Sequence, residues 1–179
     1  MKDVILIKQA LHVDHRGHFF ESFNQQVLDK INSPCPFVQN NISFSEKKNT
    51  IRGLHYQSAP YQQAKYICLL SGSILDVFVD ARPTSDSFGS VFTVELTEPG
   101  DGLYLPRGYC HGFRSLEDNT RISYMVDNPY QQESELSVRW DDSELNIDWK
   151  LDQATPITSE KDLNGITWNE FITRLKDND

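Results

Sequence analysis

Between residues 37 and 126 the chain is divided into short runs of apolar and β-branched residues, and no segment has a convincing helical period. Turn residues separate the runs, for example at Ser71-Gly72 and Pro99-Gly100. The runs expected to form strands are residues 38–43, 51–56, 64–70, 73–80, 89–96, 102–105, 112–116 and 120–126. Many short strands at this spacing predict an antiparallel sandwich or barrel rather than an α/β fold.

The N-terminal segment predicts two strands and a helix. Residues 4–11 alternate weakly, residues 12–17 form a polar turn that ends in Gly17, and residues 18–23 are a short aromatic strand. Asn24 can cap a helix from Gln25 to about Ile31, because the apolar positions that follow it have helical spacing.

The C-terminal segment is polar after Pro129, with Trp140 and Trp149 as apolar anchors. Thr167 and Glu170 fit a capping box that opens a last helix at about residues 167–176. The apolar face of this helix consists of Trp168, Phe171, Ile172 and Leu175. Since no repeat, linker or low-complexity tract interrupts the chain, residues 1–179 are expected to form one domain.

The stretch from Ile51 to Gln57 carries a cation, a histidine and an amide on an apolar run. Strict alternation would send Arg52, Leu54 and Tyr56 to one face and His55 to the other, beside Gly53. The glycine would leave room for a ligand to approach. A single histidine in a strand is, however, more often a satisfied core residue than a functional one.

Composition narrows the classes of partner. Hydrophobic content of 38% and charged content of 24% are typical of a globular protein. A net charge of -9 argues against a nucleic-acid or anionic-membrane partner, but a few local cations can still hold a small anionic ligand.

The cysteines and the absence of long apolar runs point to the cytoplasm. Cys35, Cys68 and Cys110 are far apart without metal-ligand spacing and are expected to be reduced thiols. No run approaches the length of a membrane span, and Met1-Lys2-Asp3-Val4 lacks the apolar stretch of a signal peptide.

The motif Pro106-Arg107-Gly108-Tyr109-Cys110-His111-Gly112-Phe113 has the form of the second half of a cupin barrel signature. The first half would need His-x-His followed by a glutamate, and around His55 no such ligands are present. Because a divalent site needs three or four nitrogen or oxygen ligands, no catalytic metal is expected.

Several motifs together resemble one family. They include Phe37-Val38-Gln39-Asn40-Asn41-Ile42-Ser43, Arg52-Gly53-Leu54-His55-Tyr56-Gln57, Gln63-Ala64-Lys65, the stretches 72–82 and 85–89, the motif 106–113, Tyr124, Tyr130, Trp140-Asp141-Asp142 and Ser159-Glu160-Lys161-Asp162. In this order they resemble the dTDP-4-dehydrorhamnose 3,5-epimerase family over about residues 14–162.

The resemblance implies a mostly β, cupin-type antiparallel jelly-roll barrel with short flanking helices. It implies a homodimer in which the N-terminal strands, residues 1–23, are exchanged with the partner. The implied substrate is a nucleotide-diphospho-4-keto-6-deoxyhexose, epimerised at C3, C5 or both for surface polysaccharide synthesis, with no cofactor.

The resemblance also implies roles for individual residues. His55 would be the base, Asp162 its partner, Tyr124 the acid on the opposite face and Lys65 the stabiliser of the C4 oxyanion. The implied substrate-binding residues are Arg52, Gln39, Asn41, His111, Tyr130, Arg16, Glu21 and Gln57. A planar guanidinium suits a diphosphate, because it can bind two oxygens at once.

Two departures from the family pattern fall where it holds the nucleotide base. Leu11-His12-Val13 stands where a phenylalanine is usual, and Pro129 precedes Tyr130 where many members have a second tyrosine. Thymidine specificity is therefore open, and so is a single-centre epimerase acting on a CDP-linked sugar. Two further alternatives are a cupin that binds a sugar nucleotide without turnover and a metal-dependent cupin oxygenase.

Overall fold

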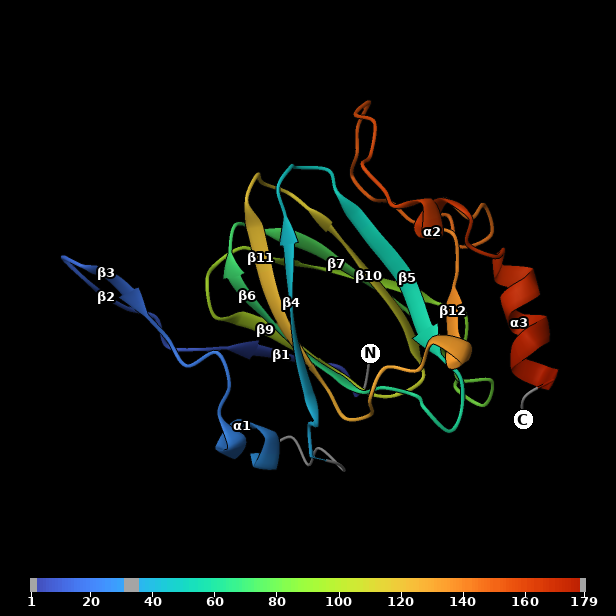
Figure 1. The fold of residues 1–179 in the computed structure, drawn as a ribbon, viewed down its shortest axis with the longest axis horizontal. Coiled ribbons are helices and arrows are strands. Elements are labelled where there is room, and N and C mark those ends of the chain that lie inside the picture. Colours follow the sequence, from blue (N-terminus) through green and yellow to red (C-terminus); the bar gives the residue numbers. More distant parts are fainter. Residues whose placement is uncertain (1–2, 31–35, 178–179) are drawn as a thin grey trace.

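The computed structural model describes residues 3–30 and 36–177, and its described part is built on two antiparallel sheets of five strands (Figure 1). The first sheet has the order β1 (Ile5–Lys8), β9 (Asp101–Leu105), β6 (Lys65–Ser71), β11 (Thr120–Val126) and β4 (Gln39–Ser45). The second has the order β12 (Glu135–Ser137), β5 (Ile51–Gln57), β10 (Tyr109–Ser115), β7 (Ile74–Asp80) and β8 (Val91–Leu96). This is the cupin-type antiparallel jelly-roll barrel with short flanking helices that the sequence predicts.

The alternation of each strand divides its side chains between the interior and an outer face. Ile67 and Phe78, from opposite sheets, belong to one buried cluster that fills the interior. Outside the second sheet, Tyr56 packs edge-on against Phe171 of α3 (Trp168–Asp177), with ring centroids 5.1 Å apart. The interior positions of the strands are therefore the ones that can line a site between the sheets.

The N-terminal segment forms an arm that projects from the barrel (Figure 1). After β1 it contains a hairpin of β2 (His12–Asp14) and β3 (Gly17–Phe19), and α1 (Gln25–Lys30) follows. The expectation that residues 12–17 are only a turn is wrong, because the turn is confined to Asp14–Gly17, where the Arg16 backbone N–H donates to the Asp14 carboxylate at 2.8 Å. Asn24 caps α1 as expected, accepting from the backbone N–H of Gln26 at 2.9 Å.

The C-terminal segment contains three short elements that the sequence does not predict. These are a short 3-10 turn (Gln132–Ser134), β12 and α2 (Glu160–Leu163). The predicted capping box is present, since the Glu170 carboxylate accepts from the Thr167 backbone N–H at 2.8 Å and the Glu170 backbone N–H donates to the Thr167 hydroxyl at 3.2 Å.

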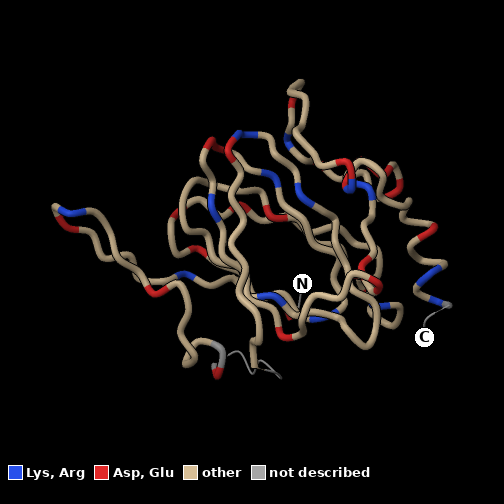
Figure 2. The backbone as a smooth tube through the Cα atoms, viewed as in Figure 1, with Lys and Arg blue, Asp and Glu red and all other residues tan. Residues whose placement is uncertain are grey.

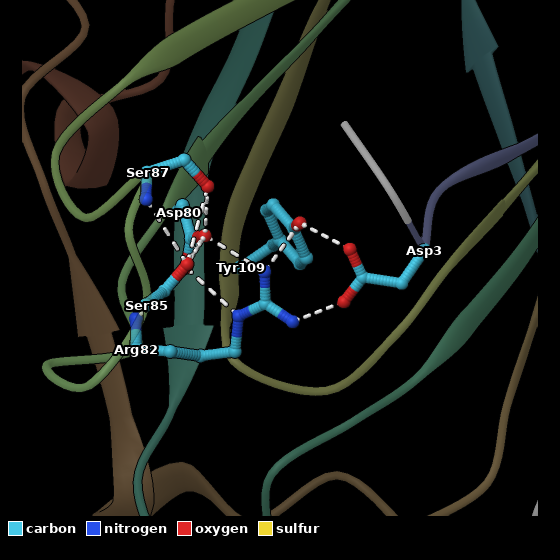
Figure 3. A network of polar contacts seen from close by, with 6 residues as sticks. All are labelled: Asp3, Asp80, Arg82, Ser85, Ser87 and Tyr109. Carbon is cyan, nitrogen blue, oxygen red and sulfur yellow. Dashed lines mark hydrogen bonds and ion pairs between the residues drawn. The ribbon is translucent and has the colours of Figure 1, made fainter.

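Arg82 connects the start of the chain to the end of β7 (Figure 3). Its guanidinium donates to the buried carboxylate of Asp80 at 2.9 and 2.7 Å, forms an ion pair with Asp3 and lies over the ring of Tyr109 at 4.5 Å. Gly108 has a positive φ, and a Cβ there would lie 2.4 Å from Cγ of Arg82. Glycine at this position therefore lets the arginine pass and hold the beginning of β10.

Cys68 and Cys110 are buried free thiols, and Cys35 lies outside the described residues. Among the helices of the described ranges, none has the length and apolar character that a membrane span requires.

Candidate active site

A cavity of about 200 Å³ lies between the two sheets and is closed on one side by the C-terminal segment. Its lining includes six of the predicted site residues: Arg52, His55, Lys65, His111, Tyr124 and Asp162. An adjoining cavity of about 260 Å³ shares His55, Lys65 and Tyr124 with it and adds Gln57 and Tyr130. The structure thus brings most of the predicted residues to two cavities that share part of their lining.

His55 and Asp162 form a close pair in this space. Nε2 of His55, on β5, lies 2.7 Å from Oδ1 of Asp162, on α2. Asp162 is 3% exposed, and although burial alone would raise the pKa of its carboxyl, hydrogen bonds from His55, Ser159 and the Gly53 backbone lower it. Asp162 is therefore a carboxylate near neutral pH, and it leaves Nδ1 of His55 as the ring nitrogen available to a ligand.

Arg52 lines the same cavity as His55, so the expected separation of these two residues by strand alternation is wrong. The pairing of β5 with β10 shifts register between His55, opposite His111, and Arg52, opposite Phe113. Two residues of β5, Gly53 and Leu54, thus face the single residue Gly112 of β10, with Gly53 at a φ of 115°. The bulge places Arg52 on the inner side, while Ile51, Leu54 and Tyr56 all pack in the cluster under α3.

Lys65 is half-buried on the inner face of β6. Burial lowers the pKa of its ammonium to about 8, while the charges of Asp76, Cys110 and Glu135 act in the opposite direction. Within the part of the chain that the structure describes, Lys65 forms no salt bridge, so its ammonium is available to an anionic ligand atom.

Tyr124 reaches the cavity from β11, in the sheet that faces the strand of His55. Burial raises the pKa of its hydroxyl, the nearby Arg52 lowers it and Glu135 raises it, with a net increase. The phenol therefore stays protonated at neutral pH. A base and an acid on two walls of one cavity can add and remove protons on opposite faces of a ligand.

His111 forms a second histidine–aspartate pair. Its Cα is the pairing partner of the His55 Cα, and its Nε2 lies 3.1 and 3.0 Å from the carboxylate oxygens of Asp76, on β7. Burial lowers the pKa of the His111 ring, and Lys65 and His55 add to this effect while Asp76 opposes it.

Of the other predicted binding residues of the barrel, Gln57 and Tyr130 line the adjoining cavity, whereas Gln39 and Asn41 line neither cavity. Gln39 and Asn41 share the inner side of β4 and are joined by a hydrogen bond of 2.8 Å from amide to carbonyl. The hydroxyl of Tyr130 donates a hydrogen bond to the Glu135 carboxylate at 2.7 Å. The amide of Gln57 donates to the backbone carbonyl of Tyr61 at 2.7 Å and accepts from the backbone of Gln131 at 2.7 Å, so it holds the surrounding loops.

Arg16 and Glu21 lie on the arm, and the structure does not bring them into the cavity of their own chain. Arg16 pairs with Asp14 at 2.5 Å, and Glu21 accepts from the side chain of Asn24 at 2.7 Å.

Sequence reasoning missed Lys161 and Glu135, which line the adjoining cavity and form an ion pair of 2.5 Å. A signal for Lys161 is its position directly before Asp162, whereas no signal for Glu135 is visible in the polar stretch after Pro129. Acidic and basic positions are spread over the whole chain (Figure 2), yet the cavity collects the cations Arg52, Lys65 and Lys161. An acidic protein can thus hold an anionic ligand there.

Within residues 3–30 and 36–177, no three histidine, cysteine, aspartate or glutamate side chains are grouped so as to hold a metal ion. The chemistry that the described side chains support by themselves is acid–base transfer next to a stabilised negative oxygen.

The fold and this site define a jelly-roll protein with an acid–base cavity, and comparisons identify the family. The family model described as dTDP-4-dehydrorhamnose 3,5-epimerase matches residues 1–170. The enzyme of that name from Escherichia coli K12 is 39% identical over 178 residues, which cover 98% of this chain and 95% of the relative.

Solved structures agree with this match. A dTDP-6-deoxy-D-glucose-3,5-epimerase from Legionella pneumophila in complex with dTDP-4-keto-L-rhamnose has a TM-score of 0.90 and 34% identity, covering 98% of this chain and 93% of that one. A 3'-monoepimerase from Streptomyces bikiniensis, as a double mutant in complex with dTDP, has a TM-score of 0.87 and 30% identity, covering 98% and 88%. The chain belongs to the dTDP-4-dehydrorhamnose 3,5-epimerase family, whose members are isomerases.

Proposed function

We propose that this protein epimerises a nucleotide-diphospho-4-keto-6-deoxyhexose of the dTDP-4-dehydro-6-deoxyglucose type at C3, C5 or both. The observation that carries the proposal is the position of His55 and Tyr124 on facing sheets, with Lys65 in the same cavity. A carbon next to a ketone loses a proton only when the resulting negative oxygen is stabilised, and the site has a group for each part of that reaction.

In the proposed mechanism Nδ1 of His55 removes the proton from the carbon next to the C4 ketone. The electron pair of the C–H bond forms the enolate double bond, and the negative charge moves to O4, where the ammonium of Lys65 stabilises it. Tyr124 then gives its hydroxyl proton to the same carbon from the opposite face, which inverts the centre. Asp162 holds the His55 ring in the required tautomer and stabilises its charged form. These steps require no cofactor or metal.

In the proposal, cationic and polar side chains at the rim of the cavity bind the nucleotide part of the substrate. Arg52 lines the cavity and donates to the Phe44 carbonyl at 2.8 Å, so its guanidinium is oriented before the ligand arrives. In the proposal Arg52 binds the diphosphate, Gln39, Asn41 and Tyr130 contact the nucleotide, and His111 binds the sugar.

The proposal includes a homodimer in which the arm of one protomer completes the cavity of its partner. Val13 and Phe19 are 72% and 66% exposed on the arm, and Ile42 is 68% exposed on the edge strand β4. Exposed apolar side chains on an unpaired edge favour association. Arg16 and Glu21 would then contact the nucleotide in the partner's cavity. The free thiols of Cys68 and Cys110 are consistent with the cytoplasm as the location.

Incubation with dTDP- and CDP-4-keto-6-deoxyglucose in D₂O tests the proposal. Each inverted centre should gain one deuterium, so mass spectrometry and NMR separate a 3,5-epimerase from the single-centre alternative, which the similarity to a 3'-monoepimerase keeps open. Tight binding of both sugar nucleotides with no exchange at either carbon would contradict the proposal and favour a binding protein.

A further inference from the structure

The acid–base mechanism gives no role to the buried carboxyl group of Asp76. Asp76 lies on the inner face of β7, between Ile74 and Phe78 of the interior cluster, and is 0% exposed. A carboxylate in such surroundings is costly unless it is paired and hydrogen-bonded. Its partner is the His111 ring, at 3.1 and 3.0 Å, and His111 in turn lines the cavity.

We propose that Asp76 is a positioning residue for the sugar end of the cavity. It accepts the Nε2–H of His111, so that the Nδ1 lone pair of that ring faces the ligand and accepts from a sugar hydroxyl. The inference rests on the proposed function, because the ligand of His111 and Lys65 is taken to be the 4-keto sugar.

The geometry indicates different roles for His55 and His111. Both rings hydrogen-bond to an aspartate carboxylate through Nε2, which donates, and the two histidines are Cα partners on neighbouring strands. His55 is partly open to the cavity, whereas His111 is buried. A buried ring that stays neutral, with its proton held by Asp76, presents an acceptor and leaves donation toward O4 to Lys65.

The charge of Asp76 also acts on Lys65, which gives the proposal a second readout. Burial lowers the pKa of Lys65 to about 8, and the first of the charges that oppose this effect is that of Asp76. Without Asp76 the ammonium would lose its proton at a lower pH. The other titratable or charged groups around Lys65 are Cys110 and His111 on β10, Glu135 on β12, His55 and Arg52 on β5, Tyr124 on β11 and Lys161 on α2.

Two NMR measurements on the full chain test the proposal without relying on turnover. In the ¹⁵N-histidine-labelled wild type, His111 should carry its proton on Nε2 at neutral pH, with assignment from His111→Gln. In the ¹³C-lysine-labelled protein, Lys65 should titrate at a lower pH in Asp76→Asn than in the wild type, by about one unit, the low end for a nearby opposite charge. Asp76→Glu keeps the charge and should leave this titration near the wild-type value.

Asp142→Asn is the matched control. Asp142 is also a buried carboxylate, but it accepts from the backbone N–H groups of Glu144 and Trp168, at 3.0 and 2.9 Å, under α3. Its replacement should lower the melting temperature without moving the Lys65 titration. A merely structural role for Asp76 predicts the same result for Asp76→Asn.

Activity gives a third readout. The pH at which kcat/KM falls on the alkaline side should move down with the Lys65 titration in Asp76→Asn, while Asp76→Glu should lose up to about 100-fold at constant pH, as for a misplaced group. A proton on Nδ1 of His111 in the wild type, or an unmoved Lys65 titration in Asp76→Asn, would overturn the proposal. An inactive wild type would instead contradict the proposed function and leave the NMR results to decide the role of Asp76.

Discussion

The Nε2 atom of His55 and the Oδ1 atom of Asp162 lie 2.7 Å apart, although 107 positions separate the two residues along the chain. The pair forms because α2 begins beside β5: Ser159 caps α2 by accepting from the Asp162 backbone N–H at 3.1 Å. Residues 159–162, remote in sequence, thus complete a wall of the cavity.

Replacement of the base should abolish proton exchange at the sugar. His55→Asn keeps a side chain of similar polarity, and we expect it to fold and to bind the nucleotide diphosphate because Arg52 is untouched. Deuterium uptake into the 4-keto sugar, measured by mass spectrometry, should be lost. Exchange at the wild-type rate in this variant would remove His55 from the mechanism.

Loss of the charge at Asp162 should weaken catalysis without eliminating it. In Asp162→Asn the His55 ring loses the carboxylate that fixes its tautomer and stabilises its protonated form. We expect kcat to fall by roughly 10²- to 10⁴-fold, the range of acid–base components, with KM little changed. The exposed neighbour Glu160, replaced by Gln, serves as the control and should retain wild-type kcat.

Activity should decline as the pH rises through about 8, the pKa of Lys65. The ammonium stabilises the enolate and is present below this pKa, so deprotonation above it removes the stabilising charge. Because the pKa of the Tyr124 hydroxyl is raised, the titration of Tyr124 does not mask this decline in activity. In Lys65→Arg the charge persists at high pH, so the reduced activity of that variant should no longer show the decline. An alkaline limb that is identical in both proteins would assign it to another group.

The protein should discriminate only weakly between nucleotide bases. His12 lies on the exposed hairpin with its ring centroid 6.3 Å from that of Phe19, at the position where the family resemblance predicts a phenylalanine. An aromatic contact contributes about 0.5–1.5 kcal/mol beyond its buried area, so dTDP and CDP should bind within about tenfold of each other.

Calorimetry with both diphosphates, on the wild type and on His12→Phe, decides this question. The variant should tighten dTDP more than CDP, because the thymine methyl adds apolar area to the stack. A wild-type preference for dTDP of about a hundredfold or more would show that other residues read the base.

The protein should be a dimer in solution. Light scattering at micromolar concentration should give about twice the chain mass of 20.6 kDa. Asp replacing the 72%-exposed Val13, in Val13→Asp, should weaken the association, whereas Lys47→Ala, at an exposed turn, should not. A fully active monomer would contradict the dimer.

The strands of residues 37–126 could be predicted because turn residues separate their apolar runs, and the last helix because Thr167 and Glu170 form its capping box. The bulge at Gly53 could not, since a register shift depends on the partner strand β10. It moved Arg52 to the side of His55 against the alternation. The hairpin strand β2 was missed because its polar residues face solvent in the described structure.

Of the candidate site, the residues within recognisable motifs could be predicted, and those positioned only by tertiary contact could not. Glu135 lies in a polar stretch, and its place near the cavity results from the pairing of β12 with β5, in which it faces Gln57. Asp76 is one of several acidic residues in strands, and only the fold shows that its carboxylate meets His111.

The projecting hairpin has a consequence for how the proposed dimer tolerates damage. A chain with a disabled base but a sound arm and a chain with a sound base but a disabled arm would each form inactive pairs with their own kind. Mixed together, they would regain one working cavity per hybrid pair, since the intact arm of the first reaches the intact barrel of the second. In that arrangement each functional site consists of the barrel of one chain and the N-terminal arm of another, so two different defective chains can complement each other.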